Sequence, residues 1–151
     1  MSFQEKNIAV SLVNFILILG FYSIRVFQMI QGESFVSTNV FRLWGIIIAL
    51  AVVVTIFATI LTHIVSAIIH AVKTGEEKSE IEDIQDERDR LIDLRGTKIT
   101  YFVTSIGGFL AMLTFVLGHP PLVMFTLLIF FGVVGQIIGD ILRLYLYRRG
   151  F

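Results

Sequence analysis

The chain has 151 residues, of which 56% are hydrophobic and 16% charged, with 14 Phe, no Cys and a formal net charge of zero. Soluble domains are about 45–50% apolar and about 25% charged, whereas the mean hydropathy here is +0.84. These values exclude an ordinary soluble domain. They also exclude a disordered tail, which needs low hydrophobicity and high net charge, and a scaffold held by disulfides. We therefore expect a small polytopic membrane protein.

Four apolar stretches are each near or above the roughly 20 residues that cross a bilayer as a helix. They occupy residues 8–30, 43–72, 99–117 and 122–146. The first has one lysine before it and no small-x-small cleavage site after it, so we expect a retained span rather than a secretory signal. The sequence predicts one all-α integral membrane domain over residues 1–151, a bundle of four transmembrane helices. A Gly-His-Pro-Pro turn at residues 118–121 predicts a tight hairpin of the last two.

The charges are concentrated in one segment. Of the 24 charged side chains, fifteen lie between Lys73 and Lys98, nine acidic and six basic. The pattern predicts a charged helix over about 76–95, with Gly75 before it and Gly96 after it. A solvated connector, a helix that docks a partner or pairs with itself, and a helix on the membrane surface are the alternatives. The acidic excess disfavours the last, because anionic lipid attracts basic faces.

Lys and Arg in short loops indicate the orientation, because such loops are retained on the cytoplasmic side. Lys6 precedes the first span, six basic residues lie in the charged segment, and three follow or end the fourth span. The connection at residues 31–42 has one basic residue and the turn at 118–121 has none. We therefore expect both termini and the charged helix to face the cytoplasm.

Small residues recur at steps of three and four in the last two spans, which lets helices approach closely in lipid. The glycines of this pattern are Gly107, Gly108, Gly132, Gly135 and Gly139. They predict packing within the bundle or, alternatively, the interface of a homo-oligomer. The first span is richest in bulky side chains, and we expect it to lie on the lipid side.

Polar side chains from three spans fall at one depth, about 9–15 Å from the cytoplasmic boundary at 1.5 Å per residue. They are Asn14, His63, Ser66, Gln136 and Asp140. Helical spacing puts Gln136, Asp140 and Arg143 on one face. An Asp140–Arg143 pair and a hydrogen bond from His63 to the protein are the structural explanations. The functional hypothesis is a cavity open to the cytoplasm that binds a cation, proton or small polar solute, with His63 and Asp140 titrating.

The sequence has no motif typical of a metal site, a nucleotide site or a catalytic centre. There is no Cys, no His-x-x-x-His or Glu-x-x-His pair and no phosphate-binding loop with Lys-Ser or Lys-Thr. A haem on His63 would need a second histidine at the same depth, and His119 is expected at the opposite face. We expect no enzymatic activity, no cofactor, no metal site and no nucleic-acid partner, since the main exposed segment is acidic.

The segment Asp-Glu-Arg-Asp-Arg-Leu-Ile-Asp-Leu-Arg-Gly at residues 86–96 resembles the D-E-R-D-x-x-I-x-x-R/K-G/A signature of a family of small four-span membrane proteins of bacteria and archaea whose function is unknown. The resemblance implies a location in the cytoplasmic membrane, no established activity, and genes that in some members neighbour small helix-turn-helix regulators. We expect a membrane anchor or sensor that docks a cytoplasmic protein, or alternatively a small oligomeric channel or transporter. The docking candidates are Asp86, Glu87, Arg88, Asp89 and Arg95.

Overall fold

The computed structural model describes residues 3–74 and 87–149, with side chains described for residues 4–57, 60, 64 and 87–149. Four helices account for these ranges. They are α1 (Phe3–Gln31), α2 (Ser37–Thr74), α3 (Glu87–Val116) and α4 (Pro121–Arg149). All four helices contain a segment that is long and apolar enough to cross a membrane. In α2 this segment is Ser37–Phe57. The predicted all-α class and the four-helix count are thus confirmed for the described chain.

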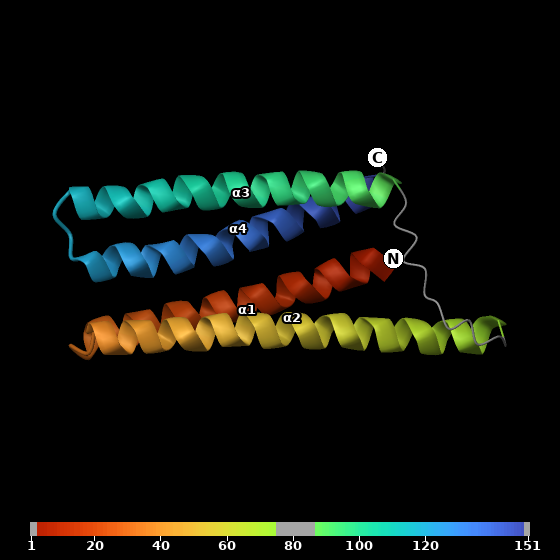
Figure 1. Ribbon diagram of the computed structural model, residues 1–151, viewed down its shortest axis with the longest axis horizontal. Helices are drawn as coiled ribbons and strands as arrows, with labels where there is room; N and C mark the ends of the chain where they lie inside the picture. Colours follow the sequence, from red (N-terminus) through yellow and green to blue (C-terminus); the bar gives the residue numbers. More distant parts are fainter. Residues whose placement is uncertain (1–2, 75–86, 150–151) are drawn as a thin grey trace.

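The helices run alternately up and down (Figure 1). The starts of α1 and α3 and the ends of α2 and α4 lie at one end of the bundle, which we call the terminal end. The two short turns that join α1 to α2 and α3 to α4 lie at the other, the turn end. In the second turn Gly118 adopts a φ of 88°, and the N–H of His119 donates to the Thr114 carbonyl at 3.1 Å. This ending is common at helix C-termini, and Pro121 then begins α4, so the predicted hairpin forms.

The predicted charged helix over 76–95 is wrong in its described part. Residues 87–95 are not a separate helix but the first turns of α3, which continues through Gly96 into the third span. Gly96 is buried against α4, where a Cβ would lie 2.5 Å from Arg143 Cγ. Its role is therefore close approach of two helices rather than a helix end. Residues 76–86 lie outside the described part of the chain.

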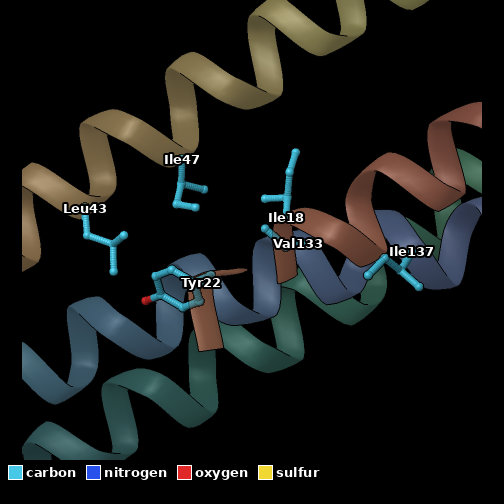
Figure 2. Packing of buried hydrophobic residues seen from close by; sticks show 6 residues of the cluster. All are labelled: Ile18, Tyr22, Leu43, Ile47, Val133 and Ile137. Atoms are coloured by element: carbon cyan, nitrogen blue, oxygen red, sulfur yellow. The ribbon is translucent and has the colours of Figure 1, made fainter. Parts of the chain in front are cut away.

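The apolar core joins α1, α2 and α4. Figure 2 shows Tyr22 and Ile18 of α1 between side chains of the other two helices. Those side chains are Leu43, Ile47, Val133 and Ile137. Tyr22 is only 2% exposed. The expected lipid-facing surface is therefore only part of α1: one stripe of its bulky residues fills the space between α2 and α4, while its other bulky residues, such as Leu17, are exposed.

The Tyr22 hydroxyl supplies a polar link within this core. It donates to the carbonyl oxygen of Thr126 on α4 at 2.7 Å. We expect Tyr22→Phe to lower the free energy of unfolding by about 0.5–1.5 kcal/mol, because the ring is kept and one hydrogen bond is lost. Equilibrium unfolding in mixed micelles, followed by circular dichroism, measures this. Tyr101→Phe on α3, whose side chain is 70% exposed, is the control and should leave the free energy unchanged.

Close packing between α3 and α4 depends on glycine at some of the predicted positions. A Cβ at Gly107 would overlap Phe131, and a Cβ at Gly135 would overlap Thr104 Oγ1 and lie 3.2 Å from the Thr100 carbonyl oxygen. A Cβ at Gly139 would likewise overlap Thr100 Oγ1 and would lie 3.1 Å from the Gly96 carbonyl oxygen. Gly108 has only an ordinary contact with Leu128. Gly132 was expected in the stripe, but among the described residues no atom lies within 4 Å of its Cβ position, so it points away from the seam.

Candidate functional site

A buried carboxylate lies between α1 and α4 in the half of the bundle near the terminal end. Asp140 is 3% exposed. Its Oδ2 accepts a hydrogen bond from Ser11 Oγ of α1 at 2.7 Å. Its Oδ1 accepts from Gln136 Nε2 at 3.2 Å and from Arg143 Nη1 at 2.9 Å. A carboxylate in apolar surroundings is stable only with such donors, and the sequence supplies two of them one helical turn to either side of Asp140.

Arg143 connects this buried carboxylate to the surface. Its Nε lies 3.0 Å from Asp93 Oδ1, and its Nη2 donates to Thr97 Oγ1 at 2.8 Å. The Arg143 side chain is 11% exposed, whereas that of Asp93 is 68% exposed. One guanidinium thus links an interior acid on α4 with an exposed acid on α3. The missing side chain at Gly96 leaves the space that this guanidinium occupies.

A second set of polar contacts closes the terminal end. The Tyr147 hydroxyl donates to Asp89 Oδ1 at 2.8 Å, and Arg88 Nη2 donates to the Tyr147 carbonyl oxygen at 3.4 Å. Arg148 on α4 pairs with Glu5 on α1, with 3.4 Å between Nε and Oε1. The first two contacts hold the first turns of α3 beside the last turns of α4, and the third joins α4 to α1.

A cavity of about 350 Å³ extends from this end into the bundle. Its wall on α1 is a row of mostly polar residues at helical spacing, interrupted by Ile8 and followed by apolar ones: Gln4, Asn7, Ile8, Ser11, Asn14, Phe15 and Ile18. From Gln4 to Asn14 the row descends about 15 Å at 1.5 Å per residue. Asp89, Ile92, Asp93, Gln136, Asp140, Arg143 and Tyr147 line it from α3 and α4, and Ala51, Val54 and Thr55 line it from α2. All the charged lining residues come from α3 and α4, whereas Phe15 and Ile18 of α1 and Ala51 and Val54 of α2 form an apolar part of the wall.

Three of the five predicted site residues meet at this cavity. Asn14, Gln136 and Asp140 all line it. The side chains of His63 and Ser66 lie outside the part of the chain whose side chains are described, so the proposed His63–Asp140 pair stays a prediction. The predicted alternative for Asp140, a pair with Arg143, is present and belongs to the same cavity.

Sequence reasoning missed Ser11, which makes the shortest contact to Asp140, and Asp93, the second partner of Arg143. A signal for Ser11 was available. Asn7, Ser11 and Asn14 recur at steps of four and three and therefore share one face of α1. Asp93 carried no such signal, because its contact with Arg143 joins residues on different helices.

Four of the five predicted docking residues lie in the first turns of α3. Glu87, Arg88 and Arg95 are exposed, and Arg88 and Asp89 also contact Tyr147 of α4. Asp86 lies outside the described residues. Two members of the predicted set therefore hold α3 to α4.

Over the described residues, no group of three or more His, Asp or Glu side chains could hold a metal ion. No protein-family model, no curated protein and no solved structure matches this chain. The cavity itself is consequently the main evidence for what the protein does.

Proposed function

We propose that this chain is a four-span protein of a prokaryotic cytoplasmic membrane that binds a small, positively charged solute in the cavity around Asp140, as the substrate site of a small transporter. The observation that carries this proposal is the set of ionisable residues in the cavity wall. They are Asp89, Asp93, Asp140 and Arg143, with a formal charge of −2 from three acids and one base. In a wall of low dielectric constant, an excess of negative charge attracts cations and repels anions.

The proposed orientation places the cavity mouth in the cytoplasm. Lys6, Arg148 and Arg149 lie at the terminal end of the bundle, where the first turns of α3 also carry basic residues. The turn end has Arg42 in the first turns of α2 and no basic residue in the α3–α4 turn. Positive residues in short loops are kept in the cytoplasm, which supports this orientation. Apolar residues such as Ile18 line the deep end of the cavity, so outward release of the solute requires a second conformation.

Thermal unfolding of the purified full-length protein in detergent tests this function. The probes are K⁺, Na⁺, Mg²⁺, protons and a series of organic amines, each at constant ionic strength. At least one should raise the Tm of the wild type, and Asp140→Asn should abolish that rise. Ser105→Ala, at an exposed position of α3 that does not line the cavity, is the matched control and should respond like the wild type. The proposed function is wrong if neither an inorganic cation nor an organic amine raises the wild-type Tm. It is also wrong if the same cation raises the Tm of Asp140→Asn by as much as that of the wild type.

A second candidate function rests on the first turns of α3. We propose that this end of α3 docks a cytoplasmic protein, because Leu91 and Leu94 are 46% and 57% exposed among charged neighbours. The two leucines lie one helical turn apart, and contiguous exposed apolar surface marks protein interaction sites. The resemblance of residues 86–96 to the membrane-protein signature is compatible with a regulator as the partner.

Site-specific photo-crosslinking in native membranes tests docking. A photoreactive residue at Leu94 should give one discrete protein adduct, and Arg95→Glu in the same chain should remove it. The control position is Phe109, which is 65% exposed but lies in the apolar middle of α3. Docking is contradicted if Leu94 gives the same products as Phe109.

A further inference from the structure

The cavity wall contains both a polar and an apolar group of side chains, and this bears on what the solute is. The polar group around the buried carboxylate includes Ser11, Asn14, Gln136 and Asp140. The apolar part, contributed by α1 and α2, includes Phe15, Ile18 and Val54. A hydrated inorganic ion would contact only the first part and would leave the second exposed to water, which is unfavourable. A solute with both a charged and an apolar end contacts both.

The polar groups nearest to Asp140 have free capacity to accept hydrogen bonds. Gln136 donates its Nε2–H to Asp140, and because an ionised carboxylate only accepts, this fixes the amide so that Oε1 points away from Asp140. Gln136 lies one turn, about 6 Å, deeper than Asp140 along α4. Asn14 lines the cavity, and none of the described residues shares a hydrogen bond with its side chain.

The carboxylate itself can accept one more donor. Among the described residues Oδ2 of Asp140 accepts from Ser11 alone, whereas Oδ1 accepts from both Gln136 and Arg143. Each carboxylate oxygen has two acceptor sites. A donor from the solute can therefore bind Oδ2 while Arg143 keeps its contacts with Asp93 and Thr97.

Size and donor chemistry disfavour a bare metal ion. A volume of about 350 Å³ lies at the lower end of the range of cavities that bind small organic molecules, about 300–1,000 Å³. A calcium ion takes about 6–8 oxygen ligands held close together, whereas the described acids offer no cluster of three. A protonated amine needs only a few acceptors, because its N–H groups point to separate partners.

We propose that the solute is an amphipathic organic amine. Its ammonium group binds Asp140 Oδ2 and the side-chain oxygens of Asn14 and Gln136, and its hydrocarbon part lies against Phe15, Ile18 and Val54. This identity rests on the proposed function, since it names the class of cation that the Asp140 cavity takes.

Isothermal titration calorimetry of the full-length protein in detergent tests the amine. The probes are butylamine, hexylamine, hexanol and KCl. Hexylamine should bind about 15-fold more tightly than butylamine, because each of the two extra buried methylenes increases the affinity about fourfold. Hexanol should bind at least tenfold more weakly than hexylamine because it lacks the charge. Asp140→Asn should weaken hexylamine binding at least tenfold, and Ser105→Ala should leave it unchanged.

Two milder variants test the two parts of the wall without removing the buried charge. Asn14→Ala should weaken butylamine and hexylamine binding by the same factor, because it removes an acceptor for the head group. Val54→Thr, which is nearly isosteric, should reduce the gain from butylamine to hexylamine. If both variants bind both amines as the wild type does, the inference is overturned even where Asp140→Asn fails to fold.

The results distinguish failure of the proposed cation site from failure of the proposed amine ligand. K⁺ binding that depends on Asp140, without amine binding, overturns the amine and leaves the cation site. Hexylamine binding that persists in Asp140→Asn reports partition into micelles and overturns the amine site. The absence of binding by every cation overturns both.

Discussion

In equilibrium unfolding in mixed micelles, Gly139→Ala is expected to lower the free energy of unfolding by about 1–3 kcal/mol, the usual cost of forcing extra atoms into a packed interface. A Cβ at this position would overlap Thr100 Oγ1 and lie 3.1 Å from the Gly96 carbonyl oxygen. The carbonyl belongs to the α3 backbone and cannot rotate away. The helices must therefore separate, and close packing is what holds helices together in lipid.

Gly132→Ala is the matched control for this prediction, because it makes the same chemical change on the same helix. No described atom lies within 4 Å of the Cβ position at Gly132. We expect no loss, and a gain of up to about 1 kcal/mol from the better helix propensity of alanine. Equal losses in the two variants would mean that the α3–α4 seam does not depend on close approach at Gly139.

Apolar length and charge distribution were sufficient to predict the four helices and their alternation. They were not sufficient for the helix limits. The sequence around Gly96 looks like a break, because glycine weakens helices and the residues before it are charged. The helix continues because Arg143 of α4 occupies the space beside Gly96 and bonds Asp93 and Thr97. A contact between two helices decided a limit that local propensity predicted differently.

Depth was predictable from the sequence, but direction around each helix was not. Counting residues placed Asn14, Gln136 and Asp140 at one level, and all three line the cavity. The same counting gave no reason to prefer Gly139 over Gly132, although only Gly139 faces α3. Likewise, the number of bulky residues in α1 indicated contact with lipid but did not indicate which stripe of the helix faces its neighbours. Tyr22 and Ile18 lie on the stripe that faces α2 and α4.

Arg143→Met is expected to cause the largest loss of stability. Asp140 is 3% exposed and Arg143 is its cationic partner, with 2.9 Å between Nη1 and Oδ1. Removal of one partner of a buried ion pair costs about 3–5 kcal/mol, because the remaining charge is left uncompensated. Asp140→Asn should cost less, since Arg143 keeps Asp93 as a second acid. Unfolding in mixed micelles, followed by circular dichroism, measures both.

The double variant Asp140→Asn with Arg143→Met distinguishes a lost ion pair from lost packing. It leaves no unpaired charge at this position, and the amide oxygen that replaces the carboxylate can still accept a hydrogen bond from Ser11 Oγ, which in the wild type lies 2.7 Å from Asp140 Oδ2. We therefore expect the loss in the double variant to be smaller than the sum of the two single losses by about 0.5–3 kcal/mol, the range of coupling between contacting residues. Additive losses would instead assign the cost to the contacts of Arg143 with Thr97 and Gly96, and the pair with Asp140 would contribute little to the fold.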